Sequence, residues 1–118
     1  MALLTGRNLI WAAAAVQILC ALLHSLAWPR IQEMFPGDAR RMAMLLWFLL
    51  AIDWVVFSVV WGLGAAAGPV ARPLLLASAV VPVAVAVGLV LTLGPAFFAV
   101  YLQLAAAGLL LTGALRLA

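Results

Sequence analysis

Residues 73–115 read PLLLASAVVPVAVAVGLVLTLGPAFFAVYLQLAAAGLLLTGAL, a stretch of 43 residues without a charged side chain. A helix crosses the ~30 Å hydrocarbon core of a bilayer in about 20 residues, so this stretch is too long for one crossing and suits two. Gly94 and Pro95 form the one turn signal near its middle. The stretch therefore predicts a hairpin of two transmembrane helices, over about residues 73–93 and 96–116.

The first half of the chain contains two further apolar stretches. An uncharged run that starts at Asn8 predicts a transmembrane helix over about 8–28, which Pro29 is expected to end. Another helix is expected over about 40–63, and Asp53 is the only acidic residue in it. These two segments predict a second hairpin.

Charged residues gather between the first two helices. Residues 29–41 hold five of the nine charged residues of the chain and are expected to form an interfacial loop. Within this loop, Asp38 is expected to be the N-cap of the second helix, because its carboxylate can accept from the free amides of the first turn.

The composition places the whole chain in the membrane class. Hydrophobic residues make up 70% of the 118 residues and charged residues 8%, against about 45–50% and about 25% in soluble domains. Unpaired backbone groups are costly in lipid, and the alternation of a β-barrel strand is absent. We predict one all-α integral membrane domain over residues 1–118, with four transmembrane helices in an up-down bundle of two hairpins.

The same composition argues against several classes of function. The six basic residues are all arginines that stand singly or as one pair, whereas nucleic-acid binding needs a clustered basic face. The sequence has no phosphate-binding loop, nucleophile elbow or Cys-x-x-Cys motif. Cys20 is the only cysteine, which excludes a disulfide within one chain and a multi-cysteine metal site.

The arginines give little information about orientation. With four crossings they divide equally between the two faces, three on the side of the N-terminus (Arg7, Arg72, Arg116) and three on the other (Arg30, Arg40, Arg41). Because the arginines balance, we expect only a weak preference for both termini inside, set by the terminal amine and by neighbours in a complex. The alternative is dual topology, in which the chain inserts both ways and pairs with a second copy of itself.

Asp53 is the strongest single signal for function. A charged carboxylate at the centre of a membrane helix costs ~2.5–3.5 kcal/mol on insertion scales, and such residues usually face the bundle interior or a wet cavity. At ~1.5 Å per residue, Gln17 lies at the same depth as Asp53, about 17 Å from the face of the first loop. His24 lies about 6–8 Å from that face, so we expect Gln17 to be the partner of Asp53. Asp53 either binds a proton or cation or specifies packing through Gln17 and Trp54.

The first helix carries a polar stripe. Ala13, Gln17, Cys20 and His24 share one face, which we expect to point into protein. His24 is either a satisfied polar residue or a ligand, a proton-relay member or a hydrogen-bond donor. One histidine cannot make a zinc site, and a bis-histidine haem would need a second chain. No cofactor follows from these residues.

The fourth predicted helix carries a second stripe, of small and polar residues, that we expect to pack against another helix (Tyr101, Ala105, Gly108, Thr112). Gln103 lies about 200° from Tyr101 around this helix, so the two side chains cannot face one cavity. Both are candidate ligand-binding residues.

The tryptophans agree with the predicted layout of the helices, with one exception. Two pairs of tryptophans fall near opposite membrane faces, as interfacial belts require, while Trp54 lies in mid-helix (Trp11 with Trp61; Trp28 with Trp47).

Pro82 stands in the middle of the third predicted helix and frees the carbonyl of Ser78, which predicts either a static kink or a hinge.

In size and hairpin layout the expected protein is similar to the small multidrug resistance exporters. The similarity covers architecture only. Those exporters carry a membrane-embedded glutamate in their first helix, whereas Gln17 stands in the first helix here and the acid, Asp53, is in the second.

Three classes of function fit these features. The first is an accessory or structural subunit of a larger membrane assembly. The second is a homo-oligomeric transporter or channel in which Asp53 binds a proton or cation, with Gln17 and His24 along its access route. The third is a membrane enzyme or a cofactor or ligand binder that uses His24 and Tyr101.

Overall fold

The computed structural model describes residues 5–118, and every regular element in this range is helical. Five α-helices and two short 3-10 helices follow one another along the chain: α1 (Gly6–Ile31), η2 (Gln32–Met34), α2 (Gly37–Ala67), η3 (Gly68–Ala71), α3 (Arg72–Ser78), α4 (Val80–Leu93) and α5 (Phe98–Leu115). The prediction of an all-α chain with long apolar helices is confirmed.

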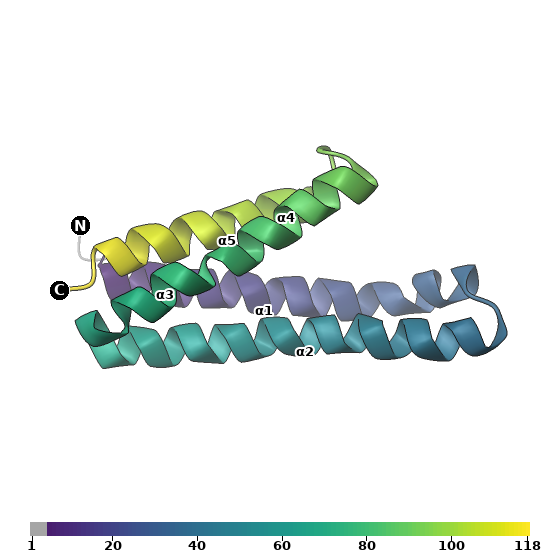
Figure 1. Ribbon diagram of the computed structural model, residues 1–118, viewed down its shortest axis with the longest axis horizontal. Coiled ribbons are helices and arrows are strands. Elements are labelled where there is room, and N and C mark those ends of the chain that lie inside the picture. The colour runs from purple at the N-terminus through teal and green to yellow at the C-terminus, as the bar shows by residue number, and fades with distance from the viewer. Residues whose placement is uncertain (1–4) are drawn as a thin grey trace.

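Helices α1 and α2 lie antiparallel and side by side along the 52 Å length of the molecule (Figure 1). The chain reverses at η3, α3 and α4 run back across this pair, and α5 returns along α1 and α4 (Figure 1). The beginning of α1 and the end of α5 meet at one end of the bundle, which we call the closed end. At the other end, the open end, α4 and α5 diverge from α1 and α2.

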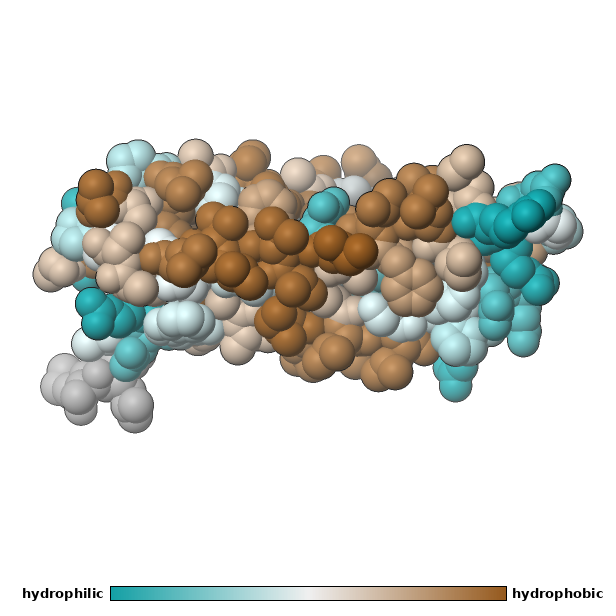
Figure 2. All heavy atoms as spheres, turned by 90° about the horizontal axis from the view of Figure 1, so that it is seen from below, coloured by the Kyte–Doolittle hydropathy of each residue, from teal (hydrophilic) through white to brown (hydrophobic). Residues whose placement is uncertain are grey.

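Three continuous helical stretches in residues 5–118 are long and apolar enough to cross a membrane: Gly6–Met34, Gly37–Leu93 and Phe98–Leu115. The second stretch includes α2, η3, α3 and α4. On the face shown in Figure 2, most hydrophilic residues gather at the two ends of the molecule, and a broad, mainly hydrophobic band lies between them. This face therefore has the distribution of surface polarity expected of a protein in a bilayer.

The helix ends differ from the sequence predictions at two points of the first hairpin. Pro29 does not end the first helix, because α1 continues through it to Ile31. Asp38 is not the N-cap of α2, since that position is Pro36 and Asp38 lies in the first turn. There its carboxylate pairs with the Arg41 guanidinium, and a negative charge also suits the positive end of the helix dipole.

The third predicted helix is divided into two. Ala79 interrupts it between α3 and α4, three residues before the buried Pro82. The Ser78 hydroxyl donates to the Leu75 carbonyl at 3.0 Å and accepts from the Trp61 indole N–H at 2.9 Å. The break is therefore held by a fully buried hydrogen bond to α2.

The closed end is held by close backbone contact. A Cβ added at Gly6 would lie 2.6 Å from the Gly113 oxygen, and one added at Gly113 would lie 2.8 Å from the Gly6 oxygen. Only glycine permits this approach of α1 to α5. Arg72 closes the same end, because its guanidinium donates to the carbonyls of Ala114 and Leu117 at the C-terminus of α5.

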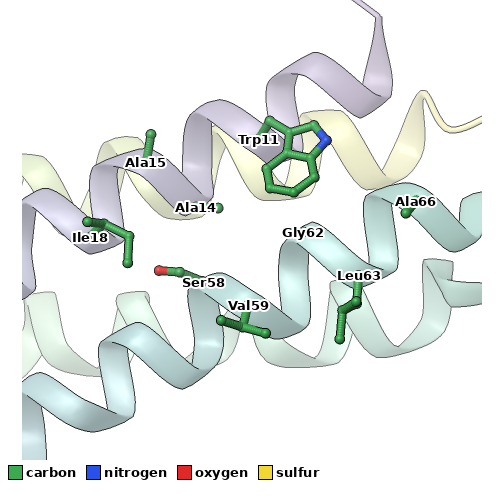
Figure 3. A pocket seen from close by; sticks show the side chains of 9 residues that line it. All are labelled: Trp11, Ala14, Ala15, Ile18, Ser58, Val59, Gly62, Leu63 and Ala66. Atoms are coloured by element: carbon green, nitrogen blue, oxygen red, sulfur yellow. The ribbon is translucent and has the colours of Figure 1, made fainter.

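The tryptophans do not form two simple interfacial belts. Trp61 is fully buried in the core of the closed end, where an interfacial position was expected. Trp11 is half exposed, and its indole lies over Gly62 of α2, where a Cβ would come within 2.6 Å of the ring (Figure 3). Trp61 therefore serves packing rather than the membrane interface.

Candidate functional site

Asp53 lies on the exposed face of α2, next to the centre of this helix of 31 residues. Its carboxylate forms no ion pair or hydrogen bond with any residue in 5–118. The predicted hydrogen bond with Gln17 is wrong, because both polar atoms of Gln17 are buried without a partner. At this depth Trp54, one residue and 100° further around α2, faces the interior in place of Asp53.

A group of polar atoms is enclosed between the helices. The side chains of Gln17 on α1 and Gln103 on α5 are fully buried, and neither their oxygens nor their nitrogens have a partner among the described residues. The indole nitrogen of Trp54 is also buried and has no hydrogen-bond partner among the described residues. Cys20, also buried, lies close to the side chain of Gln103.

These groups can donate and accept. Each amide offers an oxygen acceptor and two N–H donors, and the indole offers one donor. Buried polar groups in folded proteins almost always have a partner, since an unpaired group costs about 1–3 kcal/mol. The interior of the bundle therefore contains hydrogen-bonding groups that the described residues leave unpaired.

His24 and Trp47 form a reciprocal link between α1 and α2. The rings stack with their centroids 3.8 Å apart and their planes 11° from parallel. The Trp47 indole N–H donates to the His24 carbonyl at 2.8 Å, and His24 Nε2 lies 3.0 Å from the Trp47 carbonyl. The predicted His24–Asp53 separation agrees with this arrangement, because the partner of His24 is Trp47.

The tautomer of His24 follows from its partner. A carbonyl oxygen can only accept, so Nε2 carries the hydrogen of this bond. The other ring nitrogen, Nδ1, forms no hydrogen bond with any residue in the described range and is not buried. In the neutral ring this Nδ1 is a free acceptor.

Aromatic rings surround this link. Trp54 meets the His24 ring edge-on at a centroid distance of 5.1 Å. Trp28 packs against Trp47 and Phe48, with both centroid distances at 6.1 Å. The ring of His24 is thus fixed in position by two rings of α2, Trp47 and Trp54.

A groove of about 670 Å³ opens beside His24 at the open end. We call it the open-end groove, and its walls are the residues of α1, α2 and α4 and of the two connections at this end. Apart from His24 and Trp47 its lining is entirely apolar and includes four leucines and two phenylalanines (Leu46, Leu50, Leu89, Leu93, Phe35, Phe97). The indole nitrogen of Trp47 and Nε2 of His24 are already bonded, so among the side-chain nitrogens of the lining residues only Nδ1 of His24 is uncommitted.

The predicted stripe on the last helix faces outward. Tyr101 is 61% exposed, and the three small residues that share its face are exposed as well (Ala105, Gly108, Thr112). Within residues 5–118 this face does not pack against another helix as expected, because the opposite face, with Gln103, lies against α1. Tyr101 is not among the residues that line the groove beside His24.

The prediction that the polar stripe of the first helix points into protein is confirmed for three of its four residues. Ala13, Gln17 and Cys20 are buried, and His24 is half-buried at the edge of the groove. In residues 5–118 no three side chains of the His, Cys, Asp or Glu types come together as a metal site would need. Trp47 was missed as a site residue, although its depth from the first loop matches that of His24.

Comparison with known proteins adds no assignment: no protein family, no curated protein and no solved structure matches the chain.

Proposed function

We propose that this protein is a subunit of a larger membrane assembly and that it contacts its partner through the face of α2 that carries Asp53. The observation that carries the proposal is the exposed Asp53 side chain, which has no partner among residues 5–118. In lipid, a carboxylate at this depth costs ~2.5–3.5 kcal/mol. A polar or basic group on a neighbouring transmembrane helix would remove that cost.

The surroundings of Asp53 support a helix partner. Leu49 and Val56, one turn away on either side, are about half exposed, so the carboxylate stands in a wide apolar surface. Lipid tails around such a surface offer the carboxylate no hydrogen-bond partner. A second polypeptide is therefore a better neighbour for Asp53 than lipid.

We also propose that the chain crosses the bilayer four times, with α1, α2, the α3–α4 segment and α5 as the crossings. At ~1.5 Å per residue, the 18 residues of α5 span about 27 Å, close to the hydrocarbon thickness. The longer α2 spans about 46 Å and reaches past the hydrocarbon on one or both sides. Three arginines then fall on each side, so both termini inside and dual topology are both compatible with the charge distribution.

A second candidate function is transport of a proton or cation by a homo-oligomer. The unpaired polar atoms of Gln17, Gln103 and Trp54 support it, because they put hydrogen-bonding groups in the interior of the bundle. In this version Asp53 of one copy faces the other copy, and the interface between copies contains the carboxylate.

Extraction from the native membrane tests both candidates. Tagged wild-type chain is solubilised mildly, and the mass and protein composition of the purified complex are measured beside Asp53→Leu and Asp53→Asn. Glu33→Gln, which removes a charge outside the apolar band, is the matched control. We expect a complex with a second protein that is lost in Asp53→Leu and retained in the control.

Three results would change the proposal. A complex made only of copies of this chain favours the transporter. An unchanged heteromeric complex in Asp53→Leu contradicts the role of Asp53. A wild-type monomer contradicts the subunit proposal.

A further inference from the structure

We propose that the open-end groove binds a membrane-soluble molecule with an apolar body and a hydroxyl group, and that Nδ1 of His24 accepts the hydrogen bond of that hydroxyl. This ligand site goes beyond the proposed assembly role. It rests on the lining of the groove and on the hydrogen bonds of His24.

The groove has the size and lining of a small-molecule site. Its volume of about 670 Å³ lies within the ~300–1,000 Å³ typical of ligand pockets. Such pockets combine an apolar lining with a few placed polar groups. Here the lining is aliphatic and aromatic, and His24 supplies the polar group.

The chemistry of the ligand follows from the tautomer of His24. Nε2 is committed as a donor to the Trp47 carbonyl, which leaves Nδ1 as an acceptor without a partner in the described chain. A ligand that uses this atom must bring a donor. An uncharged hydroxyl is the donor that an apolar, membrane-soluble molecule can carry at low cost.

The acceptor is also held in place before the ligand arrives. Stacking on Trp47, two hydrogen bonds and the edge of Trp54 fix the His24 ring. A fixed acceptor loses little conformational freedom on binding, which favours affinity and selectivity. The acyl chain of a phospholipid would fill the groove but would leave Nδ1 unpaired.

The test compares 4-nonylphenol with its methyl ether, 4-nonylanisole, because the pair differs chiefly in the hydroxyl donor. Binding to the purified full chain in detergent is measured by titration calorimetry, with empty micelles as the reference. We expect one site per chain and about five- to tenfold tighter binding of the phenol, the range that one hydrogen bond supplies.

Three variants locate the site. His24→Phe keeps a ring that can stack on Trp47 but removes the acceptor, so the ratio of the two affinities should fall to about one. His24→Gln keeps both a donor and an acceptor, and it should retain part of the preference. Leu93→Trp fills the groove from α4 without altering His24, and it should weaken both ligands at least tenfold.

Several outcomes would overturn the proposal. Equal affinity of the wild type for the two compounds would show that the hydroxyl does not contribute to binding. A preference for the phenol that persists in His24→Phe would show that Nδ1 is not the acceptor. Unchanged binding in Leu93→Trp would place the ligand elsewhere. Failure of the phenol to bind the wild type would contradict the ligand site itself.

Discussion

The closed end and the open end of this bundle are built from different residues and have different properties. At the closed end, Gly6 and Gly113 bring the backbones of α1 and α5 into contact, and Arg72 binds the last carbonyls of α5. At the open end, bulky side chains line a groove of about 670 Å³. Small residues let membrane helices pack closely, whereas large ones leave shaped spaces between them. The close helix contacts and the groove for which we propose a ligand therefore lie at opposite ends of one small bundle.

Substitution of Gly113 should have the largest effect on stability. In Gly113→Ala the new Cβ would lie 2.8 Å from the Gly6 oxygen and from Cγ1 of Ile10, so α1 and α5 must separate. Overpacking of this kind costs about 1–3 kcal/mol, and contact with backbone places this case near the upper value. Unfolding in mixed micelles with increasing SDS measures the change.

The matched control is Gly108→Ala on the same helix. Nothing lies within 4 Å of a Cβ at Gly108, so the free energy of unfolding should stay the same or rise slightly. Equal losses in the two variants would show that the closed end is not held by the α1–α5 contact.

Removal of the Arg72 side chain should open the same end by a different route. Arg72→Met keeps most of the apolar stem but removes both hydrogen bonds to the carbonyls of Ala114 and Leu117. Hydrogen bonds from charged groups contribute about 1.5–3 kcal/mol, and partial exposure of Arg72 places the expected loss near 1.5 kcal/mol. Hydrogen exchange should rise in the last turn of α5 and stay unchanged around His24. Faster exchange at both ends would contradict the separation of the two ends.

Trp47→Phe should loosen only the open end. Phenylalanine can still stack on His24 but cannot donate to its carbonyl, so one hydrogen bond of about 1 kcal/mol is lost. Distances between spin labels on α1 and α2 near this link should broaden, while distances at the closed end keep their wild-type width. A uniform broadening would show that the His24–Trp47 link does not act locally.

Gln103→Met should have the smallest effect. The amide of Gln103 is fully buried without a partner, so a side chain of similar volume without polar atoms should leave the free energy of unfolding unchanged or raise it by up to about 1 kcal/mol. The thermal midpoint in detergent measures this. A loss above about 1 kcal/mol would show that the amide has a partner, such as bound water or a bound ligand.

The sequence correctly predicted an all-helical chain with long apolar helices, but it predicted the rotation of these helices poorly, and the count of four crossings stays a prediction. Uncharged runs located the apolar helices, because a bilayer sets their length. The rotation of α2 was wrong by about one residue, since Trp54 faces inward where Asp53 was expected. In a soluble protein a polar face marks the outside of a helix. Here both faces of α2 are apolar, so hydrophobic periodicity does not orient it.

The same reason explains the error on α5. Small residues occur on both of its faces, and close packing was assigned to the face of Tyr101 when the face of Gly113 contacts α1. The His24–Trp47 link could have been proposed from equal depth on the first two helices. Equal depth does not predict the stacked geometry of the two rings. The groove beside them also needs Leu89 and Leu93 of α4, which begins after the break at Ala79.

The central claim, that the Asp53 face of α2 meets another polypeptide, is tested most directly by photocross-linking in the native membrane. A photoreactive amino acid is placed at position 49 or 56 on this face, and at position 91 on α4, where Leu91 is 80% exposed. We predict protein adducts from positions 49 and 56 and lipid adducts alone from position 91. Lipid adducts alone from all three positions would contradict the claim.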